Sequence, residues 1–440
     1  MFAAMGTNGS SNCSGFSPLV LIRRSNYLGI AGERGQAMGM KPYLLAAMVG
    51  GLAFSGLRMW QEHNFGTGPV ESSAAQSAQG REIAFVSNAV GGTISLIDVE
   101  TMQLVAEINA IPDGKDVGFF RDPLQSIAQS IAERQGGLNY AQDSDLSRDG
   151  RVLFVSRGFL ADVVAIDLQT RNILWRTPIA GIRSDHMDIS PDGKRLFVSA
   201  IIRGGNIVEV VDTRTGKKKG HFRTGDWPHD VHVSEDGRTV YAANLGDMEK
   251  PRSKRNVDGK AYRVTVVDAN SLNIFKEHIF EAGIRPFQIS RNNRTLYAQL
   301  SNTHAIVARN LETDVQTKRL DLPVKAGVTK DDWDFEAPHH GLALSPDETT
   351  LCVAGRASDY AALVDAESLK LKTTINVGNA PSWAVFSEDG SHCLLANTRS
   401  DDVSFVSKFD QREVRRVPVG RGAKHITVGR VPAELIGKRN

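Results

Sequence analysis

Short runs of alternating hydrophobic and polar residues recur along the chain, and residues 379–420 show the pattern clearly. Apolar residues alternate over 383–386, the polar segment SEDG follows, and further apolar runs occupy 393–396, 403–406 and the residues before Val419. Each run has the length of a short strand, and each break has the composition of a turn. The unit therefore predicts four antiparallel strands, which is typical of one blade of a β-propeller.

Two polar signatures mark this unit and return along the chain. A serine precedes each turn in the first half of the unit, at Ser147, Ser190, Ser234, Ser290, Ser345 and Ser387. The motif Asp-x-x-Thr/Ser, or its Asn variant, marks the second half and begins at Asp98, Asp167, Asp212, Asp268, Asn310 and Asp365. Asp-Gly and Asn-Asn suit the positive φ of tight hairpins, and short polar side chains bond back to the backbone there.

The two ends of the repeat array complete one another. The segment that starts at Glu82 lacks a first strand, whereas AKHITVG, which ends at Gly429, is a first strand without a continuation. We therefore predict an all-β fold with a single seven-bladed β-propeller of four-stranded blades over residues 81–432, followed by a tail at 433–440. Pairing of the C-terminal strand with the first blade closes the ring and removes free sheet edges.

Several segments resemble the repeat of YVTN-type propellers. They are VYAAN at 240–244, LLANTRSDDVSFV at 394–406, and the stretches 87–108 and 190–199. The resemblance spans roughly residues 82–432 and implies the propeller fold. Such propellers include exported binding proteins, lactonases and the haem-bearing domain of cytochrome cd-type nitrite reductase, so the resemblance implies no single function.

The N-terminal region has a different character. Residues 42–57 form a charge-free apolar run behind Lys41, which is typical of an export signal and marginally short for a membrane span. We predict a leader at residues 1–60, with Met40 as a candidate translation start, and a linker at 61–80. The predicted location is periplasmic or otherwise extracytoplasmic. A membrane tether through residues 42–60 and a buried apolar helix are the alternatives.

Cys352 and Cys393 occupy the second strands of neighbouring predicted blades, where other blades carry Phe197 and Leu153. We expect two buried free thiols, with a disulfide as the alternative.

Net charge does not indicate a partner. The chain carries a formal charge of +2 with a pI near 8.3, which favours neither nucleic acid nor a membrane surface. The sequence contains no CxxCH, Gly-rich phosphate loop, GxSxG or HExxH. A cofactor would therefore be a metal ion or a non-covalent tetrapyrrole, and covalent haem is excluded.

Three insertions are predicted to emerge on one face of the ring, at residues 111–142, 245–263 and 323–339. The first contains a predicted helix at 122–134. The third is acidic, and we favour a solvated loop for it, with a cation site formed together with His339 and His340 as the alternative. Because long loops inside compact domains are usually functional, we expect this face to carry the binding site.

Residues four and five positions before each turn serine enter the first strands from this face, although alternation leaves open which of each pair faces the channel. They supply, with their neighbour His339, the candidate ligand-binding residues Asp143, Asp185, His186, His229, Arg285, His339, His340, Lys424 and His425. Imidazoles near carboxylates suit a metal, a tetrapyrrole iron or acid–base chemistry. The alternative is that each side chain only caps its own blade.

Four arginines follow the second strands and form a candidate anion site: Arg157, Arg203, Arg356 and Arg399. Their planar guanidinium groups suit a carboxylate or phosphate. The alternative is ion pairing between blades, with Asp162, Asp359 or Asp401 as partners.

The sequence thus predicts an exported propeller that binds a small molecule or a protein on its insertion-bearing face. The alternative is an enzyme, either a lactonase-like hydrolase or an oxidoreductase that depends on a tetrapyrrole or metal. The sequence identifies neither the ligand nor the cofactor.

Overall fold

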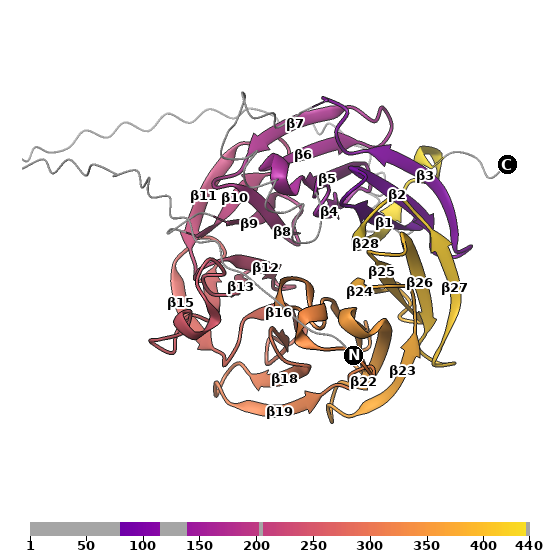
Figure 1. Cartoon of the computed structure of the whole chain (residues 1–440). Helices are drawn as coiled ribbons and strands as arrows, with labels where there is room; N and C mark the ends of the chain where they lie inside the picture. The colour runs from indigo at the N-terminus through magenta and orange to yellow at the C-terminus, as the bar shows by residue number, and fades with distance from the viewer. Residues whose placement is uncertain (1–79, 115–138, 202–205, 437–440) are drawn as a thin grey trace, which may run out of the picture. The chain divides into compact units, whose positions relative to one another are not determined.

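The computed structural model describes residues 80–114, 139–201 and 206–436, and these form seven four-stranded sheets arranged in a ring (Figure 1). The predicted all-β fold with seven four-stranded blades is confirmed. The leader, all of the linker except Gly80, and the predicted helix at 122–134 lie outside the described residues. Among the residues that are described, no helix is both long and apolar enough to span a bilayer.

Each blade runs from an inner first strand to an outer fourth strand. Blade 1 contains β28 (Ala423–Val431), β1 (Arg81–Asn88), β2 (Thr93–Asp98) and β3 (Gln103–Asn109). Blade 2 contains β4 (Asp143–Leu146), β5 (Val152–Ser156), β6 (Asp162–Asp167) and β7 (Ile173–Pro178). Blade 3 contains β8 (Arg183–Ile189), β9 (Arg195–Ile201), β10 (Ile207–Asp212) and β11 (Lys218–Arg223). Blade 4 contains β12 (Pro228–Val233), β13 (Thr239–Asn244), β14 (Arg263–Asp268) and β15 (Ile274–Ile279).

The remaining three blades follow the same order. Blade 5 contains β16 (Ile284–Ile289), β17 (Thr295–Leu300), β18 (Ala305–Asn310) and β19 (Gln316–Asp321). Blade 6 contains β20 (Leu342–Leu344), β21 (Thr350–Gly355), β22 (Tyr360–Asp365) and β23 (Leu371–Asn376). Blade 7 contains β24 (Pro381–Phe386), β25 (His392–Asn397), β26 (Asp402–Ser407) and β27 (Arg412–Pro418).

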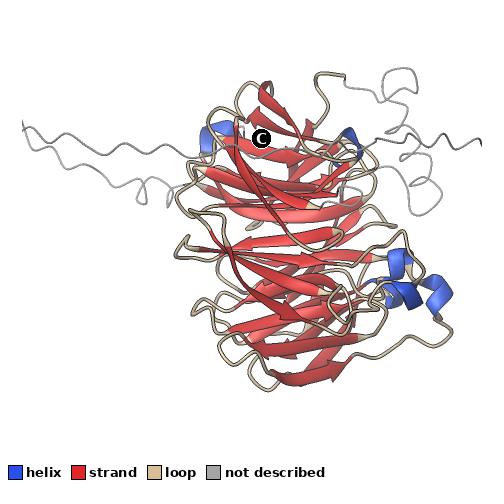
Figure 2. Cartoon of the chain, turned by 90° about the vertical axis from the view of Figure 1, so that its left-hand side faces the viewer, coloured by secondary structure: helices blue, strands red, loops and turns tan. Residues whose placement is uncertain are grey.

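Short helical turns are the other regular elements of the described chain, and Figure 2 shows how few they are beside the strands. They are η1 (Gly158–Leu160), η2 (Arg252–Lys254), η3 (Lys330–Asp332), η4 (Asp334–Glu336), η5 (Arg356–Ser358) and η6 (Ala433–Leu435).

The C-terminal strand closes the ring. β28 pairs antiparallel with β1, with Gly429 opposite Ile83 and His425 opposite Ser87. The predicted closure is therefore confirmed, and the first blade is built from both ends of the propeller. This pairing covers the edge that β1 would otherwise expose.

The turn serines fix the hairpins through the same pair of hydrogen bonds in blade after blade. In blade 7, Ser387 Oγ donates to Asp389 Oδ1 at 2.6 Å and accepts from the backbone N–H of His392 at 3.0 Å. Gly390 follows with a φ of 69°, a conformation that glycine adopts without steric cost. Asn293 and Glu348 take the equivalent position in blades 5 and 6 with φ values of 55° and 57°.

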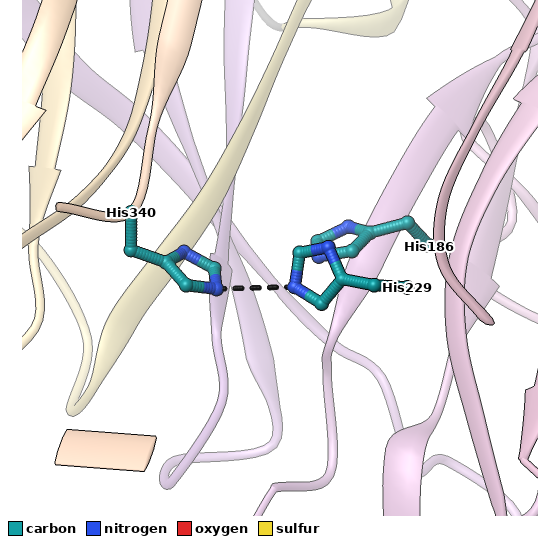
Figure 3. Close-up of side chains that lie close together, drawn as sticks. All are labelled: His186, His229 and His340. Atoms are coloured by element: carbon teal, nitrogen blue, oxygen red, sulfur yellow. Dashed lines mark hydrogen bonds between the residues drawn. The ribbon is translucent and has the colours of Figure 1, made fainter. Parts of the chain in front are cut away.

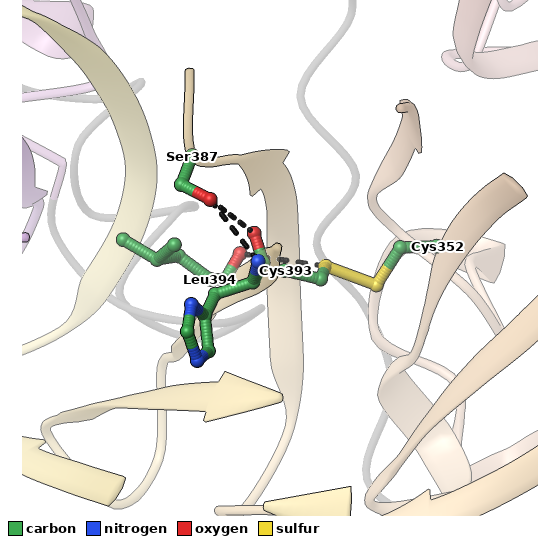
Figure 4. Close-up of a disulfide and its surroundings, with 5 residues drawn as sticks. Cys352, Ser387, Cys393 and Leu394 are labelled. Atoms are coloured by element: carbon green, nitrogen blue, oxygen red, sulfur yellow. Dashed lines mark hydrogen bonds between the residues drawn. A yellow bond between two sulfur atoms is a disulfide. The ribbon is translucent and has the colours of Figure 1, made fainter. Parts of the chain in front are cut away.

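The cysteine prediction is half wrong. Cys352 on β21 and Cys393 on β25 are fully buried, as expected, but they form a disulfide between blades 6 and 7 (Figure 4). The two cysteines differ by one position when counted from their turn serines. Because successive strand residues point to opposite faces, Cys352 faces blade 7 and Cys393 faces blade 6. The one-residue offset was the signal in the sequence for this pairing.

The inner strands carry β-bulges at the end that meets the insertion loops. The register shifts between Ser184 and Met187 in β8, between Pro228 and Asp230 in β12, and between Ile284 and Phe287 in β16. Strands β24 and β28 have shifts at the same level. A bulge inserts an unpaired residue and re-aims its side chain, so strict alternation ends where the channel opens.

Candidate functional site

A cavity of about 680 Å³ opens where the insertions meet the inner strands. Leu245, Met248 and Arg255 of the second insertion form one wall, and Trp333 to Glu336 of the third form another. The expectation that these two insertions serve the same face is therefore confirmed. Residues 115–138 of the first insertion are outside the described residues, although Gln142 at its end lines the cavity.

The bulges divide the candidate residues into two layers. Six of the seven residues five positions before the turn serines, or before Gly429 in the last repeat, line the cavity: Gln142, Asp185, His229, Arg285, His340 and Lys424. The seventh, Ser382, does not. Their neighbours four positions before the serines, all within the described chain, do not line it; they include Asp143, His186 and His425. This second layer is buried beneath the first.

Three histidines from blades 3, 4 and 6 converge, as Figure 3 shows; His229 and His340 line the cavity, and His186 does not. His186 lies on β8, His229 lies on β12, and His340 precedes β20. One ring nitrogen from each lies within 4.8 Å of those of the other two, and the Nε2 atoms of His229 and His340 are 3.2 Å apart. All three side chains are buried, although His229 and His340 also line the cavity.

Second partners orient two of these rings. Nδ1 of His340 lies 2.7 Å from the carbonyl oxygen of Ser382, and because a carbonyl only accepts, Nδ1 carries the proton. Nδ1 of His186 lies 3.1 Å from Oδ2 of Asp143. Both contacts leave Nε2 available as a ligand atom, the arrangement that metal-binding histidines commonly show. Nδ1 of His229 has no hydrogen-bond partner in the described part of the chain.

The electrostatic surroundings keep two of the imidazoles neutral. Burial, and then the nearby basic groups and rings, lowers the pKa of His229 and of His340 well below the usual value. Burial also lowers the pKa of His186, but the Asp143 hydrogen bond and the charge of Asp185 outweigh it, and the net pKa is raised. Neutral imidazole is the form that binds metals.

A second group of possible ligands shares His186. Asp143 contacts both His186 and His425, and Nδ1 of His425 lies 2.7 Å from Oδ1 of Asp143, though not aligned for a hydrogen bond. The Trp383 ring covers this group, with centroids 4.6 Å from His186 and 4.1 Å from His425. Because no member lines the cavity, this group is better suited to hold His186 in place than to receive a substrate.

Gln142 contacts the ring nitrogen of His186 that would bind an ion. Its Nε2 donates to Asp185 Oδ1 at 2.6 Å and lies 3.2 Å from Nε2 of His186. An ion bound to His186 Nε2 would therefore require the Gln142 amide to turn away from the ring.

His339 does not join the other candidate histidines. Its Nε2 lies 3.3 Å from Nδ1 of His304 and 3.5 Å from the Tyr360 hydroxyl, and the ring does not line the cavity among the described residues. Burial and the charge of His304 lower its pKa to about 3. The prediction that His339 belongs to the channel rim is therefore wrong, because its chain neighbour His340 takes that place.

The three candidate arginines that the structure describes do not form one anion site. Arg157 is fully buried and binds Asp162 at 2.7 and 2.8 Å and Asp113 at 2.7 Å. It is thus ion-paired, as in the alternative, but Asp162 lies in the same blade, and the partner from another blade is Asp113, which follows β3. Arg203 is outside the described residues. Arg356 lines the cavity, but it shares Asp334 with the exposed Arg399.

Two carboxylates of the acidic third insertion are paired with arginines. Asp334 accepts from Arg356 at 2.8 Å and from Arg399 at 2.9 Å, and Glu336 lies 2.5 Å from Arg255. Asp334 and Glu336 thus close the cavity wall by ion pairing and are not free to bind a cation.

A deeper ring of ionisable residues was missed. Asp145, Asp188 and His232 lie two positions before their turn serines, on the inner strands β4, β8 and β12. Burial raises the pKa of Asp188 to about 6, whereas Asp230 outweighs burial and raises the pKa of His232 to about 9. The count from the turn serines that located the rim would have located this ring as well.

Comparisons with known proteins support the fold alone. No family model and no curated protein matches the chain. One solved structure of similar fold is hydrazine synthase of Kuenenia stuttgartiensis, at 18% identity and a TM-score of 0.55, covering 74% of this chain and 92% of that chain. At this identity the likeness shows a shared propeller fold, and membership of the YVTN repeat family stays a prediction.

Proposed function

We propose that the protein is a metal-dependent propeller enzyme that holds one transition-metal ion on His186, His229 and His340 and receives a small molecule in the cavity above. The convergence of three imidazole nitrogens at the wall of an open cavity carries this proposal. Three protein ligands with one position left open are typical of catalytic metal sites, whereas structural sites are usually closed.

The spacing of the nitrogens suits an ion. Two ligands at about 2.0–2.1 Å from a tetrahedral metal lie roughly 3.3 Å from each other. The separation of 3.2 Å between the Nε2 atoms of His229 and His340 is close to this value. Imidazole suits zinc, copper, iron and nickel. A tetrapyrrole iron takes only one or two axial protein ligands, so three converging rings fit a bare ion better.

An ion at this position would supply Lewis-acid chemistry, polarising a carbonyl group or activating water. Hydrolysis of an ester or lactone is therefore the reaction class that we favour. A redox-active metal such as copper or iron would favour an oxidoreductase instead.

The protein is also proposed to act outside the cytoplasm. The apolar segment at 42–57 motivates this proposal, and the Cys352–Cys393 disulfide supports it because disulfides persist in oxidising compartments. The second candidate function is a metal-free binding module, which is favoured by the size of the cavity and its two insertion walls.

Cobalt titration tests the metal site. The full chain, stripped with a chelator, is expected to bind one equivalent of Co²⁺ with the visible absorption of a tetrahedral complex. The double variant His186→Ala/His340→Ala is expected to lose this signal, because only one imidazole of the three remains. Asp143→Asn should weaken binding by roughly 10–100-fold, the usual effect of removing an outer-shell partner.

His221→Ala is the matched control, since His221 lies exposed on the outer strand β11. It should bind cobalt like the unaltered protein. If the stripped protein binds no metal and the double variant only melts at a lower temperature, the histidines merely hydrogen-bond to one another and the metal proposal fails.

A further inference from the structure

The charges around the cavity do not balance. Five basic and four acidic side chains line it, so the lining carboxylates are too few to pair with every basic group. Three of the basic side chains have a carboxylate partner: Arg183 with Asp185 at 3.1 Å, Arg255 with Glu336 at 2.5 Å, and Arg356 with Asp334 at 2.8 Å. The remaining two are Arg285 and Lys424.

Within the described residues, neither Arg285 nor Lys424 forms an ion pair. Nε of Arg285 donates to Ser301 Oγ at 3.2 Å, and the residue is only 6% exposed. Burial lowers the pKa of Arg285 to about 10 and, together with the nearby arginines, that of Lys424 to about 7. A buried cation without a counter-charge is costly, so a ligand that brings negative charge would be stabilised here.

The other walls of the cavity are apolar. Phe159, Trp227, Leu245, Trp333 and Phe335 contribute side chains to it, and they come from blade 2, from the segment before β12 and from the two insertions. Such surfaces suit the hydrocarbon part of a ligand, because burial of apolar area is favourable.

We propose, on the basis of the metal site above, that the substrate is a small organic carboxylate with an apolar body. Its carboxylate binds between Arg285 and Lys424, its apolar part packs against the aromatic walls, and its reacting group lies over the three histidines. A guanidinium offers two parallel N–H groups that match the two oxygens of a carboxylate, and the aromatic walls favour an organic acid over inorganic phosphate.

Calorimetry on the zinc-loaded full chain tests this assignment with hexanoate, phenylacetate and indoleacetate as probes. At least one is expected to bind, and its neutral amide should bind at least tenfold more weakly. Arg285→Gln should weaken carboxylate binding at least tenfold without changing the zinc content. It should not lower the melting temperature of the ligand-free protein, because it removes an unpaired buried charge.

Arg291→Gln is the matched control, because Arg291 lies in the same blade on an exposed turn away from the cavity. It should bind the probes as the unaltered protein does. Lys424→Met replaces Arg285→Gln if the latter does not fold, with the same tenfold loss expected.

Three results would overturn the carboxylate assignment. They are no binding of any probe at millimolar concentration while zinc is bound, equal binding of acid and amide, and unchanged binding in both variants. Inorganic phosphate that binds where the carboxylates do not would also overturn it. The protein could also bind no metal and yet bind a carboxylate equally well whether or not zinc is added. That result would disprove the metal proposal and leave the anion site standing.

Discussion

The three histidines differ in what fixes their second ring nitrogen, and this sets how each responds to substitution. A backbone carbonyl, that of Ser382, orients His340, so no change of a single side chain removes that contact. A carboxylate, that of Asp143, orients His186 and also contacts His425, so loss of Asp143 disturbs two rings at once. His229 has no such partner among the described residues. We expect His229 to be the most mobile ligand before metal binds.

The aspartates that begin the Asp-x-x-Thr/Ser motifs should make the stability of the protein depend on pH. Hydrogen bonds from the following Thr or Ser lower the pKa of Asp167, Asp212, Asp268 and Asp365 below the usual 3.8. The unfolded chain therefore takes up these protons at a higher pH than the folded protein does. Their contribution to stability is complete above the unfolded pKa and decreases as the pH falls from about 5 toward the folded values.

Replacing all four with Asn should flatten the fall of the melting temperature between pH 5 and pH 3, with little change at pH 7. Blade 5 shows that Asn can take this position, because the side-chain oxygen of Asn310 accepts the backbone N–H groups of Glu312 and Thr313 and the amide does not titrate. Equal slopes for the variant and the unaltered protein would contradict the prediction.

At the scale of elements, the bulged inner strands turn a regular ring of blades into a site. Without the register shifts, side chains at successive positions would face opposite sides of each strand. With them, Asp185 lines the cavity while its neighbour His186 still reaches the histidine cluster. One strand can thus contribute both to the cavity wall and to the layer beneath it.

The disulfide between β21 and β25 should stabilise the fold by linking blades 6 and 7. It closes a loop of 41 residues, for which the chain-entropy description gives about 3–4 kcal/mol of stabilisation. In denaturant titrations, the free energy of unfolding of the Cys352→Ala/Cys393→Ala variant should be lower by at least about 2 kcal/mol. The variant loses both the cross-link and the buried sulfur atoms. A reductant should destabilise the unaltered protein but not the double variant.

Thiol counting checks the same bond directly. Under denaturing, non-reducing conditions only Cys13 of the full chain should react with a thiol reagent. Reaction of Cys352 and Cys393 in protein prepared without reductant would show that the two thiols are free.

At the scale of the whole molecule, ring closure makes the stability of every blade depend on β28. Deleting residues 422–440 removes the partner that β1 uses from Arg81 to Asn88, together with Lys424 and His425 of the site. We expect aggregation or a large fall in melting temperature, because blade 1 loses its inner strand and β1 becomes a free edge.

A circular permutant shows whether the deletion destabilises the protein because β28 is missing or because the chain ends earlier. In it, residues 421–436 precede Gly80 through a short turn, which the antiparallel register makes feasible because Val431 lies opposite Arg81. The permutant should remain monomeric and melt near the unaltered protein. If the deletion protein instead stayed monomeric with an unchanged melting temperature, closure through β28 would not be needed for stability.

The sequence by itself determined the number of blades, their hairpins and the closure of the ring. These features depend on local contacts, such as Ser387 with Asp389, and on strand patterns that are complete within one repeat. The same repeat count identified the face where Asp185, His229 and Arg285 line a cavity. Neighbours in sequence supply these contacts, so reading the chain in order was enough to predict them.

Only the tertiary structure decided which candidates meet. His186 and His340 approach each other because their blades face one another across a closed channel, and no local pattern encodes that distance. The bulges, and not strand alternation, decided which layer each side chain joined. His339 was a candidate as the chain neighbour of His340 but points elsewhere, since a one-residue step along the backbone redirects a side chain. Contacts between blades depend on the geometry of the complete ring.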